Sequence, residues 1–444
     1  MSWLRQYRFR HDLTNSIWIM PLAGMVLGIV AARVLYRVDV RLGWRADFNP
    51  DALRTVLITL AGVVFTLIVF LNSALLIALQ LASAQLSPRV IALLFRDRTT
   101  KAALTLFVFT FAFATAAALR VDATAPLLTT RVAGYSSIAS MAVFLYLVEH
   151  AGKSLRPGSI LRRVTRLGRQ VIEQVYPRPL TEPSQRHAAA VAPAPTGAGA
   201  RTLCSSREGV VLAFDIDGLH DMATRADCVI ELVPQVGDSI AAGDPLFRIF
   251  KTATELSDRA LFQSVVIGPE RTLEQDPTFA FRIIVDIASK ALSPAINDPT
   301  TAVLAIDQVH DLLRTVGTRR LDEERLRDAS GHVRLVYRTP DWADFVHLAV
   351  TEIRHFGSES IQVARRLRAM LEDLTQTLPE ERLALLRREL GLLEKSAERA
   401  FADPEDRALA QVADPQGVGS RQEQEIPGGT PPDGAQKSGL AAAV

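Results

Sequence analysis

Cysteine is scarce in this chain: Cys204 and Cys228 are the only two among 444 residues. Two cysteines without a pairing pattern exclude a small disulfide-stapled scaffold, and we expect both thiols to be reduced. Cys228 lies in an apolar run, where a small thiol packs as a core residue. The length allows roughly two to four domains.

Net charge is also small, because 50 Lys and Arg residues against 48 Asp and Glu leave only +2. Nucleic-acid-binding chains carry a clear basic excess, so we expect no nucleic-acid partner. Hydrophobic residues make up 48% of the chain. They are concentrated before residue 152, whereas most charged residues follow it.

Familiar catalytic motifs are missing as well. The chain has no GxxxxGK[ST], HExxH, CxxC or GxSxG pattern. These absences leave little support for a nucleotide enzyme, a zinc protease or a serine hydrolase. We therefore expect no enzymatic activity, no catalytic residue, no cofactor and no metal.

One cluster of possible metal ligands stands against that expectation: Asp215, Asp217, His220 and Asp221 crowd within DIDGLHD. Their spacing matches no established ligand pattern. We favour the alternative, in which a strand turns at Gly218 into a short capped helix.

Long hydrophobic runs are what the chain does have. Residues 53–87 contain no charge after Arg54 and no proline. As one helix they would be roughly 50 Å long, against about 30 Å for the hydrocarbon core of a bilayer. Gly24, Gly28 and Ala32 add a small-residue face to the first run, where another helix can approach closely. We predict four transmembrane helices, at about 17–35, 55–82, 102–120 and 133–150.

The basic residues that flank these runs indicate the orientation. Thirteen Lys and Arg residues lie in the segments on one side of the predicted helices and five in the loops on the other. Because cytoplasmic segments carry the excess, we predict a multi-pass protein of the bacterial inner (plasma) membrane with both termini in the cytoplasm.

Polar residues form a stripe along the second predicted helix. Asn72, Gln80, Ser83 and Ser87 fall within an arc of roughly 80°. Polar groups in hydrocarbon need partners, so the stripe either packs against another helix or lines a pore. We favour packing, because no membrane-embedded acid or base accompanies these residues.

An amphipathic helix is predicted directly after the fourth run, at 159–175. Its arginines Arg162, Arg163, Arg166 and Arg169 cluster opposite an apolar face. Such a helix can lie on the inner leaflet with its arginines on anionic headgroups. The alternative is an ordinary helix packed on its neighbours with a solvated basic face, and we favour the membrane surface.

The remainder of the chain changes composition several times. Residues 201–251 read as short strands whose glycine turns resemble the half-barrel of biotinyl and lipoyl carrier domains, but no lysine lies between Arg201 and Phe250 to carry a cofactor. The fold class we expect is four transmembrane helices plus a cytosolic α+β region with a small β-sandwich-like segment. The expected parts are a transmembrane block (1–152), a juxtamembrane amphipathic helix (153–176), a linker (177–200), a small β module (201–251), a helical module (252–401) and a disordered tail (402–444).

Proline and aspartate mark helix starts in the helical module. Asp276 and Asp298 each precede a proline, as an N-cap carboxylate does, and Asp341 is expected to act alike for a helix running to about 374. Pro379 opens a further helix that ends near residue 401.

The first of these helices carries a charged stripe, in which Arg282, Asp286 and Lys290 stand four residues apart. We favour a structural ion pair, and the alternative is an anion-binding or coupling site. If the stripe is buried, loss of Asp286 would cost about 3–5 kcal/mol.

Three segments carry a resemblance to a known family: AQLSPR at 84–89, RTLEQDPTFAFRIIVDIASKALSPAINDPTTA at 271–302, and HFGSESIQVARRLRAMLEDL at 355–374. They resemble the uncharacterised bacterial membrane proteins of domain-of-unknown-function family 2254. The resemblance implies a multi-pass inner-membrane protein and supplies no activity.

Three functions remain open on this evidence. The favoured one is a membrane scaffold or a regulatory or sensory protein with a cytosolic interaction module. The alternative is an oligomeric channel-like or transport protein whose 53–87 helix lines the path, and an enzyme acting on a membrane substrate ranks last. We expect a homo-oligomer in contact with the bilayer and with anionic inner-leaflet lipids.

Overall fold

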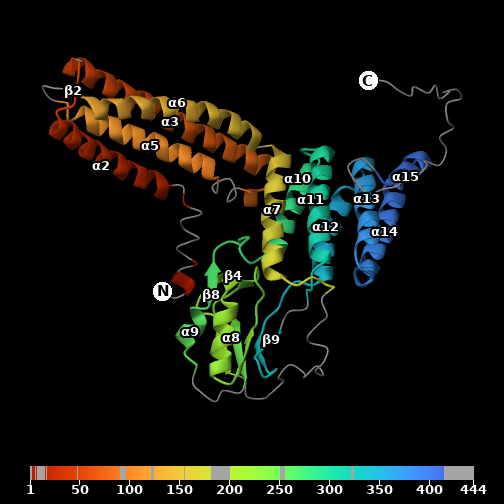
Figure 1. The fold of residues 1–444 in the computed structure, drawn as a ribbon. Coiled ribbons are helices and arrows are strands. Elements are labelled where there is room, and N and C mark those ends of the chain that lie inside the picture. Colours follow the sequence, from red (N-terminus) through yellow and green to blue (C-terminus); the bar gives the residue numbers. More distant parts are fainter. Residues whose placement is uncertain are drawn as a thin grey trace, which may run out of the picture.

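The computed structural model describes residues 3–5, 7, 16, 18–47, 49–90, 97–121, 125–154, 156–181, 201–250, 256–321 and 325–414. Figure 1 shows a slanted bundle of long helices on one side and a group of shorter helices, with a β region beside them, on the other. We call the second part, residues 156–414, the C-terminal module. Most of the expected linker (182–200) and of the expected tail (415–444) lies outside the described residues.

The bundle consists of the four apolar helices that the sequence predicts. In the described part of the chain, four helices are long and apolar enough to cross a membrane. The expected fold class, four such helices plus an α+β region, is confirmed. The bundle helices are α2 (Ile19–Leu42), α3 (Pro50–Gln85), α5 (Arg98–Ala118) and α6 (Leu127–Ser154), and the short strands β1 (Arg45–Ala46) and β2 (Ala125–Pro126) pair at their outer ends.

Small residues let α2 lie close to α5. Gly24, Gly28 and Ala32 are all buried, as their spacing predicts. A Cβ atom built on Gly28 would lie 2.6 Å from the Phe109 carbonyl oxygen, and one on Gly24 2.9 Å from that of Thr105. Both distances are shorter than any real contact, so the helices can meet at this spacing only because a side chain is absent.

The C-terminal module is built largely from helices whose N-caps the sequence predicts. Asp276 and Asp298 accept hydrogen bonds from the backbone N–H groups of Phe279 and Thr301. Asp341 forms a reciprocal capping box with Asp344. The helices are α7 (Pro157–Val175), α10 (Pro277–Ala291), α11 (Pro299–Gly317), α12 (Trp342–Phe356), α13 (Ile361–Thr377), α14 (Glu380–Ala400) and α15 (Pro404–Ala410).

Two expectations about these helices are corrected. The single helix expected to reach residue 374 is two, because α12 ends before Gly357 and Ser360 caps a new helix, α13. The tail expected to be disordered from 402 instead begins with α15, whose first turn Asp403 caps.

The amphipathic helix α7 does not lie on a leaflet through its apolar face. Ile160, Val164 and Ile172 are buried in one core with residues of α10 and α11. A Cβ on Gly168 would lie 2.6 Å from the Cβ of Ala280 in α10, so the two helices touch closely. The expectation of a membrane-surface helix is wrong in this respect, because protein rather than lipid covers the apolar side.

The β region extends beyond the expected module at 201–251. One sheet has the order β3-β7-β5-β10-β9 and the other β6-β4-β8, and β10 runs parallel to β5. The strands β8, β9 and β10 come from the part expected to be helical. The elements are β3 (Arg201–Cys204), β4 (Gly209–Phe214), α8 (Ile216–Arg225), β5 (Val229–Leu232), β6 (Ser239–Ile240), β7 (Pro245–Phe250), α9 (Asp258–Phe262), β8 (Val265–Gly268), β9 (Arg325–Arg327) and β10 (Val333–Val336).

The contact of α2 with α5 can be tested at Gly28. Gly28→Val should lower the free energy of unfolding by about 1–3 kcal/mol, because the added atoms collide with the α5 backbone. Unfolding of the purified protein in detergent by added sodium dodecyl sulfate measures this change. Gly134→Val in α6 is the control, since a Cβ there meets nothing within 4 Å. Equal effects of the two substitutions would contradict the close packing.

Candidate functional site

The end of α3 enters the C-terminal module. Leu86 is buried in the main core of that module, and the hydroxyl of Ser87 accepts a hydrogen bond from the backbone N–H of Arg89 at 3.3 Å. The chain turns there through the 3-10 element η1 (Pro88–Val90), and the Arg89 guanidinium pairs with Asp286 of α10. This arrangement joins the bundle to α10 by an ion pair.

Lys290 of α10 makes a second contact with the same helix end. Its Nζ donates to the carbonyl oxygen of Ser83 at 2.8 Å. The last four carbonyl groups of a helix have no partner within the helix, and the helix dipole makes this end attractive to a cation. Lys290 therefore caps α3 from a distant part of the chain.

Arg282, the third member of the charged stripe, turns toward α12. Its guanidinium donates to Glu352 at 2.6 Å and lies 3.8 Å from Asp286. Burial raises the pKa of Asp286 above its usual 3.8, while Arg89 and Arg282 oppose that rise. Since both cations of the stripe already contact protein oxygens, the anion-binding alternative loses its support.

Two stripes that the sequence indicated separately thus meet in the structure. The Ser83 carbonyl contacts Lys290, and Ser87 begins the turn whose Arg89 pairs with Asp286. We call these five residues the junction. Asn72 and Gln80, from the same polar stripe, lie earlier in α3, away from the junction, and both side chains are exposed. The junction is only partly buried, because the side chains of Arg89 and Asp286 are 45% and 24% exposed.

A pocket of about 230 Å³ lies at the other end of α10. Its walls come from the N-terminal segment (Tyr7), the end of α7, the β region and the residues that open α10. Sequence reasoning missed this pocket, although the polar run of residues 271–276 before the helix was a signal. Among the residues that line the pocket are Tyr7, Phe214, Val236, Glu274, Tyr337 and Arg338.

Hydrogen bonds fix Gln275 and Asp276, two residues that line the pocket. Asp276, 2% exposed, accepts two hydrogen bonds from Arg271 at 2.8 and 2.6 Å besides capping α10. Gln275 mimics a strand partner, because its amide accepts from the Phe214 N–H at 3.0 Å and donates to the Phe214 carbonyl at 3.2 Å. The start of α10 is therefore fastened to strand β4.

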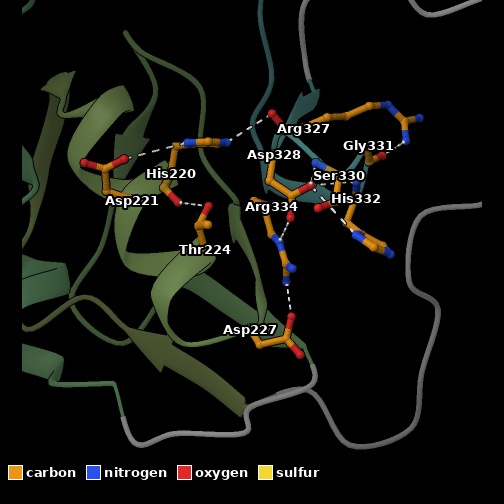
Figure 2. A network of polar contacts seen from close by, with 10 residues as sticks. All are labelled: His220, Asp221, Thr224, Asp227, Arg327, Asp328, Ser330, Gly331, His332 and Arg334. Carbon is orange, nitrogen blue, oxygen red and sulfur yellow. Dashed lines mark hydrogen bonds and ion pairs between the residues drawn. The ribbon is translucent and has the colours of Figure 1, made fainter.

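The DIDGLHD cluster forms a helix cap. Asp215 accepts a hydrogen bond from the Gly218 N–H and so begins α8, which confirms the strand followed by a capped helix. His220 lies 3.2 Å from the Arg327 carbonyl oxygen and 4.0 Å from Asp221 (Figure 2). Among the residues that the structure describes, no group of three His, Cys, Asp or Glu side chains is placed to hold a metal.

Figure 2 also shows the polar contacts that hold the β9–β10 hairpin against the rest of the β region. Asp328 accepts from Arg334 at 2.6 Å and from the backbone N–H groups of Ser330 and His332. The Arg334 hydrogen bond is the main reason why the pKa of Asp328 lies below its usual 3.8. Arg334 also reaches Asp227, just before β5, at 2.6 Å. This network is structural, and it explains how residues 325–336 join the β region.

The arginines of α7 have protein neighbours. Arg169 pairs with Asp311 of α11, and Arg162 donates to Ser159 at 3.3 Å. Arg163 acts electrostatically on Asp97, the N-cap of α5, whereas Arg166 is exposed. Contact of these four arginines with anionic lipid headgroups stays a prediction.

Four helices that are long and apolar enough to cross a membrane, joined to an α+β module, define the class as a membrane protein. The chain belongs to the family described as predicted membrane protein (DUF2254), whose model matches residues 14–373. It is similar to an uncharacterized protein of Mycobacterium bovis and to one of Mycobacterium tuberculosis, each 29% identical over 417 residues, which cover 89% of this chain and 79% of the relative. No solved structure matches the chain.

The junction ion pair can be measured by a double-mutant cycle. Asp286→Asn and Arg89→Gln should each cost about 1 kcal/mol, well below the cost of breaking a fully buried pair, because both side chains are partly exposed. The double variant should lose little more than either single variant when thermal unfolding is followed in detergent. Full additivity would contradict the pairing. Glu149→Gln is the control, since its pair with Lys153 is mostly exposed.

Proposed function

We propose that this protein is a regulatory or sensory protein of the bacterial inner membrane, whose cytoplasmic C-terminal module controls the state of α3 through α10. The observation that carries the proposal is the double attachment of α10. One end of this helix forms part of the pocket. Its Lys290 contacts the end of α3, and its Asp286 contacts Arg89 in the turn that follows α3.

The packing of α10 supports the idea that a displacement at its start is passed along the helix to the junction. The helix has 15 residues, about 22 Å, and most of its side chains are buried in the main core of the module. A packed helix moves as a rigid element rather than deforming locally. A shift imposed at its start by an occupant of the pocket therefore reaches the junction.

Two observations support the cytoplasmic placement of the module. The excess of Lys and Arg lies on the side of the bundle where the module attaches. The N-terminal residues Trp3, Leu4 and Tyr7 pack against Leu212, Ala213 and Val266 of the β region, so the N-terminal segment lies on the side of the module. An even number of membrane-crossing helices agrees with termini on one side.

A large side chain introduced into the pocket tests whether a change there reaches the end of α3. In a Cys204→Ser background, which removes the exposed native thiol, Val236→Trp should occupy part of the pocket and change the mobility of a spin label attached at Leu81→Cys, an exposed position near the end of α3. Electron paramagnetic resonance of the protein in lipid nanodiscs measures the label. Adding Asp286→Asn should reduce this response, because the ion pair that carries it is lost.

A matched control is Thr202→Trp, which adds the same bulk at an exposed position of β3 outside the pocket. It should leave the label unchanged. If Val236→Trp has no effect at Leu81, or has the same effect with and without Asp286→Asn, the module does not control α3 through the junction.

A transport role is the second candidate, and the exposure of Asn72 and Gln80 on α3 favours it. If an oligomer encloses a path lined by these amides, Asn72→Leu with Gln80→Leu should abolish ion flux into proteoliposomes while assembly stays intact. Wild-type protein without flux, or flux that survives both changes, counts against transport.

A further inference from the structure

One face of α3 is uncovered along most of its length. Its residues are separated by three or four positions and therefore lie in one row on the helix. Val69 and Leu76 are 48% and 62% exposed. We call this row the α3 face, and its residues are Ile58, Gly62, Phe65, Val69, Asn72, Leu76 and Gln80. Ser83 continues the row, and there Lys290 of α10 covers it.

The outer half of the α3 face is hollowed. A groove of about 430 Å³ lies between α3 and α5, beside Ala61, Gly62 and Ala118. A Cβ atom built on Gly62 meets nothing within 4 Å. Small residues beside an open groove are what allows two membrane helices to approach closely.

The inner half of the α3 face reaches the edge of the hydrocarbon. The rings of Phe70 in α3 and Phe144 in α6 are 5.6 Å apart, so these parallel helices are level at that point. Six residues farther along, α6 has reached His150, which lies 3.2 Å from Asp97, whereas α3 has reached Leu76. Leu76 and Gln80 thus lie at or beyond a polar layer, where acyl chains do not cover an apolar side chain.

The two amides within the α3 face have no partner in the described part of the chain. Asn72 and Gln80 are exposed, and neither side chain makes a hydrogen bond to a described residue. An amide both donates and accepts, so it can pair with an identical amide. Asparagine in an apolar seam selects a parallel pairing of identical helices in register.

We propose that the α3 face packs against the α3 face of a second copy of this chain, in a parallel dimer whose two-fold axis runs along the membrane normal. All copies share one orientation in the membrane, so such an axis brings identical residues together at the same depth. Asn72 then meets Asn72 of the second copy, and Leu76 leaves contact with water. This dimer does not depend on the regulatory role proposed above.

Gly62→Leu tests the proposal without disturbing the single chain. Leucine has the higher helix propensity and finds open space at this position, so folding should be preserved. The wild type should be a dimer by native mass spectrometry from membranes or detergent, and Gly62→Leu should be a monomer. Gly134→Leu, at an equally open glycine of α6, should remain a dimer.

A pair of adjacent cysteines locates the interface. In a Cys204→Ser background, Leu76→Cys should form an intermolecular disulfide in oxidised native membranes, at least tenfold more than Ile77→Cys. The two positions are 62% and 58% exposed and differ by about 100° around the helix. Cys228 can stay, because burial raises the pKa of its thiol to about 11 and keeps it protonated.

Asn72→Leu tests the amide pairing. It should weaken dimerisation roughly tenfold, the scale of one interhelical amide contact in a membrane. Ser73→Ala should have little effect, because the Ser73 hydroxyl already donates to the Val69 carbonyl at 3.0 Å.

Several outcomes would overturn the proposal. They are a monomeric wild type, including one with lipid bound in the groove, a Gly62→Leu variant that remains dimeric, equal or greater cross-linking at Ile77→Cys, and a cross-linked product with the mass of a different protein.

Discussion

A helix that leaves the hydrocarbon before it ends must find partners for its last carbonyl groups, and the structure depends on how α3 meets this requirement. Lys290 donates to the Ser83 carbonyl, and Arg89 in the following turn pairs with Asp286. Both partners stand on α10, the most deeply buried helix of the C-terminal module. The geometry of the membrane part and that of the module are therefore linked where α3 ends.

Close approach of backbones is the second feature that shapes the protein. Gly28 lets α2 lie against α5 in the bundle, and Gly168 lets α7 lie against α10 in the module. Hydrocarbon supplies no hydrophobic driving force between helices, so the close approach of α2 and α5 stabilises the bundle by van der Waals contact. In the module, the close approach at Gly168 allows an arginine-rich helix to bury most of its apolar side and still present charges outward.

Local signals were sufficient for much of the fold. Runs of apolar residues predict the four long helices, and Asp276 and Asp298 before proline predict the starts of α10 and α11. The junction was beyond such signals, because Lys290 and Ser83 are 207 residues apart in the sequence. The polar stripe of α3 and the charged stripe of α10 were visible separately, but nothing local indicates that they meet.

The strands β9 and β10 were also beyond prediction from local sequence. β9 and β10 have three and four residues, too few for alternation to be distinguished from a loop. The sequence does not indicate what covers the apolar face of α7, because an apolar stripe has the same pattern whether lipid or protein covers it. The sequence does not indicate the pocket at the start of α10, because its walls come from six separate stretches of the chain.

The position of β10 has a consequence for biosynthesis. This strand lies between β5 and β9, and it is made only after α10 and α11 have been synthesised. Until then the edge of β5 has no neighbour, and an open edge is a site of unwanted strand addition. About a hundred residues separate β5 from β10, so a nascent chain halted in that interval exposes this edge to strand addition.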